Sequence, residues 1–384
     1  MKPLAENSPI LMFSTEYPPK IWGGLGTHVS HLTQELSSAE IHGLLVTIPE
    51  GMHEPEYERQ DSFTIYRPQL QNEAYDNSYE WMMNINLTWI KAIQSLHQSF
   101  SLVHAHDWLT AGAAIYAKKM YRIPLIATIH SMETGRKKSL KTPAEKMIHE
   151  MEKKLLQEAD ELIVCSNYMK REILSQKADA EKITVIHNGA APFSKSSLGN
   201  PAAYPYIFSM GRFVPEKGFE DLLVAFSMIK SELPALKLVI AGEGPGKEKY
   251  EALAESLGIQ KDVIFPGFIK GEERNRYIQY AAAACIPSLY EPFGLAALEL
   301  MSAGKPLVVS DAGGLPEMVV HNESGLIYKS SHIEDLTRSL LELLKFPEKA
   351  AAISVKAHNE SKKYSWSSAA EKTIHIYKKS MQHM

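Results

Sequence analysis

Two carboxylates with seven residues between them are the side chains of this chain whose chemistry is easiest to interpret. Glu291 and Glu299 enclose the sequence P-F-G-L-A-A-L, and a short apolar run precedes them. A strand followed by a sharp turn and a helix directs the backbone N–H groups of Phe293, Gly294 and Leu295 towards the carboxyl end of the strand. Doubly wound sheets bind their ligands in the crevice at that end, so we expect a ligand site here.

The spacing of the two carboxylates limits what they can do together. If the segment between them is helical, Glu291 and Glu299 lie at most roughly 12 Å apart. That distance is too long for shared acid–base work on one atom, but it suits contacts with two parts of an elongated ligand, such as the sugar and the ribose of a nucleotide sugar. A helix start also attracts anionic groups. The alternative is a helix that carries two solvated glutamates, and the spacing alone leaves it open.

The motifs around these carboxylates resemble those of one family, the retaining glycosyltransferases of family 4, whose E-x7-E motif the segment matches. The match continues in G-R-F-V-P-E-K-G from Gly211, G-E-G-P from Gly242, M-S-A-G-K-P-L-V-V-S-D-A-G-G-L-P-E from Met301 and S-G-L-I-Y from Ser324. The resemblance implies the GT-B fold, an α/β architecture of two Rossmann-like doubly wound domains with an interdomain cleft. It also implies that the chain binds a nucleotide diphosphate sugar as its donor.

Two cations follow an apolar run in the second half of the chain. Arg212 and Lys217 stand in the turn that opens the helix from Gly218, and together they can neutralise a departing diphosphate. The sequence has no D-x-D motif of the kind that holds Mg²⁺ or Mn²⁺ in the other major glycosyltransferase architecture, so we expect no metal and no cofactor. We expect the ligand to be the partner of both cations, so that losing either leaves the unliganded protein intact. The alternative is an ion-pair network on a solvated loop.

A glycine-rich loop in the first half is the counterpart of these cations. Gly23 and Gly24 lie in K-I-W-G-G-L-G, which begins at Lys20 and resembles the K-x-G-G-L loop of glycogen and starch synthases. Such glycines allow a tight loop and a close approach of the backbone to the donor. Lys20 stands one residue further from the glycines than in that pattern, so its contact with phosphate stays open.

Two further residues of the first half follow strand-like runs. Asp107 lies in H-A-H-D-W and His130 ends A-T-I-H. In the family a histidine at this strand end lies close to the reacting sugar carbon, so we expect His130 to be catalytic rather than a satisfied polar strand end. Asp107 has two interpretations: it binds acceptor hydroxyls, or it caps the helix that starts at Trp108.

Short apolar runs alternate with stretches of helical period along the whole chain, a pattern typical of parallel sheets covered on both faces. The strands predicted in the first half are 10–14, 44–48, 63–67, 102–106, 125–130, 162–166 and 183–187. Those predicted in the second half are 206–210, 236–241, 263–266, 284–287, 306–310 and 326–328. We therefore expect an acceptor-side domain over 1–190, a donor-binding domain over 205–360, and a C-terminal helix over 361–384. From relatives, that helix is expected to cross back to the first domain.

Composition is consistent with this organisation. A chain of 384 residues is long enough for two domains. Its net charge of -4 gives no general attraction to nucleic acid or membrane. Cys165 and Cys285 lie in apolar runs and predict buried thiols in a reducing compartment. No apolar signal region or spanning segment is evident, so we expect a cytoplasmic protein.

A basic cluster over 136–141 precedes an amphipathic stretch that also carries glutamates. Membrane-associated relatives use a basic helix in this region to contact anionic lipid. We favour a solvated surface here, and we keep peripheral membrane contact and an anionic acceptor as alternatives.

Together these features predict a retaining, metal-independent transferase that moves a hexose to an acceptor hydroxyl. We favour glucose from UDP- or ADP-glucose and a carbohydrate acceptor. Glu299 is expected to bind the ribose and Glu291 the sugar, while the base is expected near Gly244 and Phe268. The sequence leaves the acceptor and the choice between UDP and ADP open. The alternatives are a nucleotide-sugar 2-epimerase of the same architecture and an inactive homologue that still binds sugar nucleotides.

Overall fold

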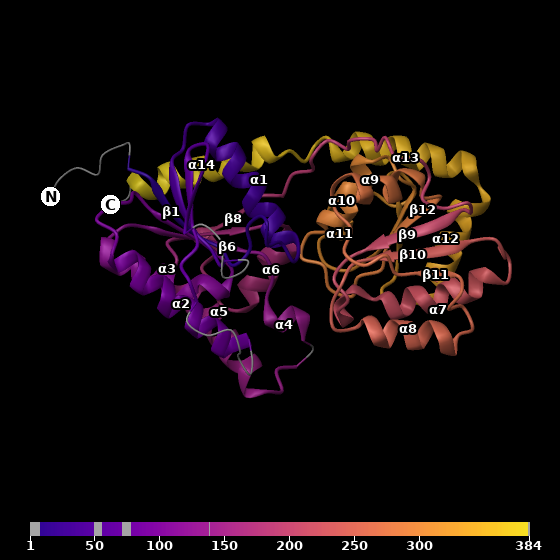
Figure 1. Ribbon diagram of the computed structural model, residues 1–384, viewed down its shortest axis with the longest axis horizontal. Helices are drawn as coiled ribbons and strands as arrows, with labels where there is room; N and C mark the ends of the chain where they lie inside the picture. The colour runs from indigo at the N-terminus through magenta and orange to yellow at the C-terminus, as the bar shows by residue number, and fades with distance from the viewer. Residues whose placement is uncertain (1–7, 50–55, 71–77, 138, 383–384) are drawn as a thin grey trace. The chain divides into compact units, whose positions relative to one another are not determined.

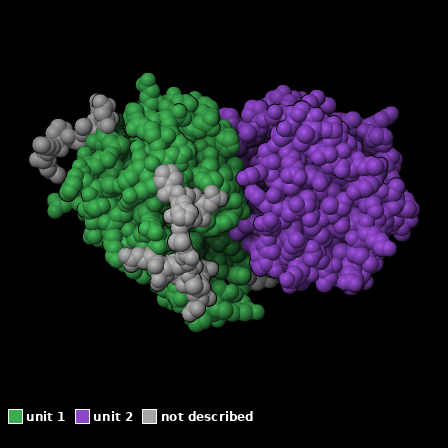
Figure 2. Space-filling view, in the orientation of Figure 1, with its two compact units in different colours: residues 1–188, 366–384 green, residues 189–365 purple. Residues whose placement is uncertain are grey.

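The computed structural model describes residues 8–49, 56–70, 78–137 and 139–382. The chain forms two compact units, which Figure 2 shows in green and purple. Unit 1 comprises Met1–Asn188 together with Trp366–Met384, and unit 2 comprises Gly189–Ser365. Each unit has one mainly parallel sheet with helices around it (Figure 1). This arrangement confirms the predicted α/β fold with two Rossmann-like domains.

Unit 1 contains an eight-stranded sheet in the order β3-β4-β2-β1-β5-β6-β7-β8. Its strands are β1 (Ile10–Phe13), β2 (Gly43–Val46), β3 (Tyr57–Gln60), β4 (Phe63–Tyr66), β5 (Val103–His106), β6 (Leu125–Ile129), β7 (Glu161–Val164) and β8 (Ile183–Val185). Its helices are α1 (Gly24–Ser38), α2 (Ser78–Gln94), α3 (Ala111–Tyr121), α4 (Glu133–Arg136), α5 (Pro143–Glu158), α6 (Asn167–Ser175) and α14 (Trp366–Gln382), with the short 3-10 helices η1 (Trp108–Thr110) and η2 (Ala180–Lys182). The central strands β1, β5 and β6 are buried along their whole length, as expected for strands covered on both faces.

Unit 2 contains a six-stranded parallel sheet in the order β11-β10-β9-β12-β13-β14. Its strands are β9 (Tyr206–Met210), β10 (Lys237–Ala241), β11 (Val263–Ile264), β12 (Ala283–Ile286), β13 (Leu307–Ser310) and β14 (Leu326–Tyr328). Its helices are η3 (Pro215–Lys217), α7 (Phe219–Lys230), α8 (Lys247–Ser256), α9 (Gly271–Tyr280), α10 (Leu295–Ser302), α11 (Leu315–Met318), α12 (Ile333–Lys345) and α13 (Pro347–Ser361). The rings of Phe213, Phe219 and Tyr250 pack edge to face in its core.

The chain order in both sheets creates a switch point where ligands usually bind. In unit 2 the chain runs from β9 outwards through β10 and β11, and then returns to place β12 on the other side of β9. Phe208 of β9 lies opposite Ala284 of β12. In unit 1 the corresponding pair is β1 and β5, with Phe13 opposite Ala105. Loops that follow these four strands are therefore the ones that position a site.

Each predicted apolar run coincides with an observed strand, whereas strand β3 was not predicted. It pairs antiparallel with β4 at the sheet edge. Its sequence Y-E-R-Q is largely polar and its side chains are exposed or half-buried, so hydrophobic periodicity gives no signal for it.

The C-terminal helix α14 packs against α1, although the two helices lie at opposite ends of the sequence (Figure 1). The preceding helix α13 packs against α10 in unit 2. The segment between β8 and β9 contains no helix or strand. In the described ranges, no helix is both long and apolar enough to cross a membrane.

Candidate active site

Lys217 and Glu291, both predicted site residues, are joined at the switch point of unit 2. Lys217 ends η3 after β9, whereas Glu291 lies between β12 and α10. Lys217 Nζ donates a hydrogen bond of 2.7 Å to Glu291 Oε2. This contact corrects the expectation that the ligand alone is the partner of Lys217. In the unliganded protein the carboxylate takes that place, because neighbouring strands bring the two loops together.

Glu291 is held firmly by its surroundings. It is 8% exposed, and Ser288 Oγ donates a second hydrogen bond of 2.9 Å to the same oxygen, Oε2. Its backbone carbonyl accepts from Gly314 N at 2.8 Å. At Gly313 a Cβ would lie 1.9 Å from that carbonyl oxygen, and φ is +65° there. Glycine at 313 therefore allows the close approach that fixes Glu291.

Arg212 differs from Lys217 in having an exposed side chain. Within the part of the chain that the structure describes, its guanidinium has neither a hydrogen bond nor an ion pair with protein. A cation that is exposed and not committed to a carboxylate is available to a phosphate group. Among the described residues of the structure, Lys217 is paired with a carboxylate and Arg212 is not, although the sequence analysis predicts the same role for both.

Glu299 lies on α10, as the motif predicts, and is paired with a residue that the sequence did not reveal. Arg274 Nη1, from α9, lies 3.1 Å from Glu299 Oε1. Burial raises the pKa of Glu299, and the charge and hydrogen bond of Arg274 oppose that rise. Arg274 belongs to none of the recognisable motifs, so only the fold shows that it orients Glu299.

The remaining donor-side residues of unit 2 occupy neighbouring loops. Helix α10 begins directly after Gly294, whose φ is +109°; a Cβ there would lie 2.7 Å from Leu315 Cδ2. Gly244 follows β10, and Phe268 follows β11 with 53% of its surface exposed. Glu243 Oε1 accepts from the backbone N of Phe268 at 3.5 Å. The loops that follow β10 and β11 thus lie side by side and present an aromatic ring to solvent.

The glycine-rich loop of unit 1 is organised by Glu16, which the sequence analysis missed. Its Oε2 accepts hydrogen bonds from the backbone N–H groups of Trp22, Gly23 and Gly26 at 2.9, 3.0 and 3.3 Å. An internal carboxylate therefore occupies the position in the loop where an anion would bind. The amide of Gly24, at the start of α1, is not among these donors.

Lys20 is turned towards its own unit. Its Nζ donates to the carbonyl of Pro49 at 3.1 Å and lies 5.2 Å from the centre of the Trp22 ring. Lys20 makes both contacts from its position, which is one residue further from the glycines than in the family pattern. The structure therefore gives Lys20 an internal role in the loop.

Asp107 and His130 are also brought together, at the carboxyl ends of β5 and β6. Asp107 Oδ1 accepts from the backbone N of His130 at 2.6 Å. Asp107 makes no side-chain capping bond to η1, so the helix-cap interpretation is wrong. The backbone of Asp107 has φ +60° and ψ 173°, a strained conformation of the kind found at functional sites. Burial raises the pKa of this carboxyl group to about 6.

His130 lies in a group of histidines from three elements. Its Nε2 is 3.2 Å from Nδ1 of His106, and its ring centre is 4.7 Å from that of His28 on α1. Burial lowers the pKa of His28 and of His130 to about 3, and that of His106 well below its usual value. All three imidazoles are therefore neutral at physiological pH.

The basic cluster 136–141 adjoins a buried acidic group. Lys138 lies outside the described residues. Arg136 hydrogen-bonds to Ser131 and lies 3.6 Å from Glu133. Glu152, on α5, accepts from the backbone N of Glu133 at 2.7 Å, and burial raises its pKa to about 8. Part of the predicted basic surface thus faces inwards.

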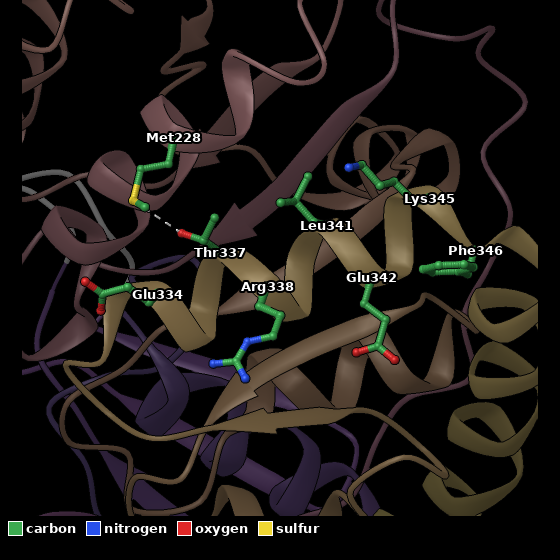
Figure 3. A pocket seen from close by; sticks show the side chains of 8 residues that line it. All are labelled: Met228, Glu334, Thr337, Arg338, Leu341, Glu342, Lys345 and Phe346. Carbon is green, nitrogen blue, oxygen red and sulfur yellow. Dashed lines mark hydrogen bonds between the residues drawn. The ribbon is translucent and has the colours of Figure 1, made fainter.

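One pocket lies apart from all these residues. Met228 of α7 and residues of α12, among them Thr337 and Leu341, line it on the surface of unit 2 (Figure 3). None of its lining residues was predicted as a site residue.

Comparison with known proteins covers nearly the whole chain. The family model described as "Glycosyl transferases group 1" matches residues 191–360, and "Glycosyltransferase Family 4" matches residues 22–192. An uncharacterized glycosyltransferase of Bacillus subtilis is 35% identical over 345 residues, 90% of each protein. The glycogen synthase of Mycobacterium tuberculosis is 33% identical over 392 residues, 96% of this chain and 94% of that protein.

Solved structures agree with these matches in fold. The sucrose-phosphate synthase of Thermosynechococcus elongatus superposes with a TM-score of 0.88 at 22% identity, covering 98% of this chain and 100% of that structure. At this identity the likeness supports the GT-B fold and leaves the substrates of this chain open.

Proposed function

Because the chain belongs to the glycosyltransferases, with group 1 matching its second half and family 4 its first, we propose that it transfers a hexose from a nucleotide diphosphate sugar to a hydroxyl group of a carbohydrate. Transfer is retaining and requires no metal. We favour glucose as the hexose and UDP or ADP as the carrier. The two buried thiols, Cys165 and Cys285, support a cytoplasmic location.

The observation that carries this proposal is the contact between Lys217 and Glu291. A cation and a carboxylate lie 2.7 Å apart at the switch point of unit 2, where the diphosphate and the sugar of a donor are expected. The exposed Arg212 stands five residues before Lys217 on the same loop. Two cations at this place can stabilise the negative charge of a departing diphosphate, a role that usually contributes roughly 100-fold or more per group to the rate.

The role assigned to Glu291 is to stabilise positive charge rather than negative charge. As the bond between sugar and phosphate breaks, positive charge develops at the anomeric carbon, and a fixed carboxylate nearby stabilises it. Ser288 and Lys217 hold this carboxylate in place before the donor arrives. No protein nucleophile is needed if a phosphate oxygen of the leaving group accepts the proton of the acceptor hydroxyl on the same face of the sugar.

The neutral imidazole of His130 suits a contact with the sugar. A neutral ring can accept or donate one hydrogen bond without adding positive charge beside the developing cation. Asp107 fixes the backbone of His130 through its 2.6 Å hydrogen bond and is therefore a positioning residue. Its remaining capacity for hydrogen bonds is available to acceptor hydroxyls.

Recognition of the nucleotide is assigned to the other residues of unit 2. Glu299, oriented by Arg274, accepts hydrogen bonds from the ribose hydroxyls. Phe268 and the backbone near Gly244 contact the base, and the exposed ring of Phe268 suits stacking. The 33% identity with a glycogen synthase across nearly the whole chain supports a carbohydrate acceptor.

A donor screen followed by product analysis tests this function. UDP-, ADP- and GDP-sugars are compared by the rise in Tm that each causes, because a ligand at 100 times its Kd stabilises the protein by about 2.7 kcal/mol. The stabilising donor is then incubated alone and with maltooligosaccharides. We expect an elongated oligosaccharide. An epimerised nucleotide sugar from donor alone would contradict the proposal, and binding without any product would indicate an inactive homologue.

A further inference from the structure

Three histidines of unit 1 converge although each belongs to a different element. His28 lies on α1, His106 ends β5 and His130 follows β6. One ring nitrogen of each lies within 4.8 Å of those of the other two. The tertiary fold, and not a local motif, brings these imidazoles together.

One ring nitrogen in this group has a lone pair that no other described group of the protein uses. His28 Nδ1 lies 2.7 Å from Asn188 Oδ1, which only accepts, so Nδ1 carries the proton and Nε2 has a free lone pair. Among the residues that the structure describes, His28 Nε2 has no hydrogen-bond partner, although it is buried. Buried polar atoms without partners are rare in folded proteins and require an explanation.

One distance in this group matches that of two ligands on one metal ion. His106 Nδ1 and His130 Nε2 lie 3.2 Å apart. Two imidazole nitrogens on one tetrahedral zinc ion, each about 2.0–2.1 Å from it, lie roughly 3.3 Å from each other. An ion can therefore replace the proton that these two nitrogens share, with little movement of either ring.

Neighbouring groups hold the rings in place. Asn188 orients His28, and the Asp107 carboxylate holds the backbone of His130. Partners of this kind orient metal ligands in known sites. The nearby His104 is excluded, because its two nitrogens already bond to Tyr377 at 2.6 Å and Thr128 at 2.8 Å.

We propose that His28, His106 and His130 bind one divalent ion of the zinc class, with three imidazole nitrogens and a water molecule as its ligands. His130 is the half-buried member of the three and provides the route by which the ion enters. If the function proposed above is correct, the bound ion also inhibits transfer, because it coordinates the imidazole of His130, which that function assigns to the sugar. Binding of the ion itself does not depend on that function.

A cobalt titration tests this site directly. Untagged protein, stripped of metal by a chelator and desalted, is titrated with Co²⁺ at about pH 7, where neutral histidines bind metal. We expect the visible absorption of tetrahedral Co²⁺ to saturate at one ion per chain and to vanish when Zn²⁺ is added. Absence of such a band would overturn the proposal. Both cysteines are buried, so thiolate ligands do not confuse the spectrum.

Three variants assign the ligands. His28→Gln should weaken Co²⁺ binding by about 10-fold or more, since even loss of an outer partner costs 10- to 100-fold. His31→Gln is the matched control. His31 lies one turn further along α1, stacks on Trp366 at a ring distance of 5.0 Å and is not one of the three ligands. The affinity of this variant for Co²⁺ should therefore equal that of the wild type. Asn188→Asp should bind more tightly, because a carboxylate makes His28 a stronger ligand. Equal affinity in wild type and His28→Gln would overturn the site.

If His28→Gln does not fold, the affinity of Asn188→Asp decides, and an unchanged or weaker affinity contradicts the proposal. Inhibition is then measured separately. Zn²⁺ should inhibit transfer by wild type and by His31→Gln, but not by His28→Gln. If no donor gives transfer at all, the proposed function fails while the cobalt titration still decides whether the metal site exists.

Discussion

Lys217 Nζ lies 2.7 Å from Glu291 Oε2, although 74 residues separate them in the sequence. The side chain of Lys217 is 20% exposed and that of Glu291 is 10% exposed, so each neutralises the other largely away from solvent. A bound diphosphate would be a second anionic partner for Lys217, in addition to Glu291. The contact therefore links the stability of unit 2 to its proposed chemistry.

The two cations should differ when they are removed. Lys217→Ala should lower turnover roughly 100-fold and should also destabilise the unliganded protein by roughly 1–3 kcal/mol, because Glu291 loses its cation. Arg212→Ala should lower turnover similarly but leave the Tm of the unliganded protein unchanged. Thermal unfolding and kcat of both variants measure this.

A double variant provides the control for Lys217. Adding Glu291→Gln to Lys217→Ala removes the unpaired carboxylate and should recover part of the lost Tm. Equal Tm losses in the Arg212 and Lys217 variants would show that the contact has no special role in stability.

The two carboxylates of the E-x7-E motif should also differ. Glu299→Gln should weaken binding of free UDP or ADP, because contact with the ribose is present before and during reaction. Glu291→Gln should keep that affinity but lower kcat, because its contact strengthens only as the glycosidic bond breaks. Calorimetric titration of both variants with both nucleotides, together with kcat, tests these roles. The reverse pattern of affinities would show that the roles are exchanged.

Arg274 should act through Glu299. Arg274→Met should weaken nucleotide binding about as much as Glu299→Gln, with little change in kcat. The double variant should lose no more affinity than either single variant, because residues that act as a unit are not additive. Additive losses would mean that Arg274 contacts the nucleotide independently of Glu299.

Much of the fold follows from the sequence, because buried parallel strands are continuous apolar runs. Strand β3 has no such apolar run, because it is a polar strand at the edge of the sheet. The motif residues Glu291 and Glu299 could be located from their spacing, but their partners could not. Arg274 lies on α9, 25 residues away in the sequence, and only the tertiary fold of unit 2 brings it to Glu299.

The candidate site residues of unit 1 were less predictable than those of unit 2. The glycine loop was found, but the role of Glu16, which binds three of its amides, depends on a turn that no periodicity describes. Asp107 precedes a helix and so resembles a cap, yet its carboxylate bonds to the backbone of His130 across the sheet. The sequence around His28 gives no indication of a site, because only the tertiary fold brings His106 and His130 close to His28.

Glu152 should make stability depend on pH. Burial raises the pKa of Glu152 from 4.5 to about 8. Between these two pH values Glu152 keeps its proton in the folded protein but has lost it in the unfolded chain. The resulting stabilisation is complete below about pH 4.5 and is lost as the pH rises through 8. Glu152→Gln keeps the acceptor for Glu133 N but has no proton to lose.

The free energy of unfolding of Glu152→Gln should therefore rise relative to wild type between about pH 4.5 and 8, by roughly 5 kcal/mol in total. Urea unfolding of both proteins across this range measures the difference, and groups common to both cancel. A difference that does not vary with pH would show that Glu152 is ionised in the folded protein.

The most direct test of the account is the configuration of the product formed in the presence of a chelator. A donor identified by the thermal screen, UDP- or ADP-glucose, is incubated with maltooligosaccharide and EDTA, and the new linkage is followed by proton NMR. For protein already stripped of metal, we predict an α-linked product formed at the same rate with and without EDTA, because Arg212 and Lys217 replace a metal at the diphosphate. A β-linked product would contradict the retaining mechanism, and activity that EDTA abolishes and Mn²⁺ restores would contradict the role of the two cations.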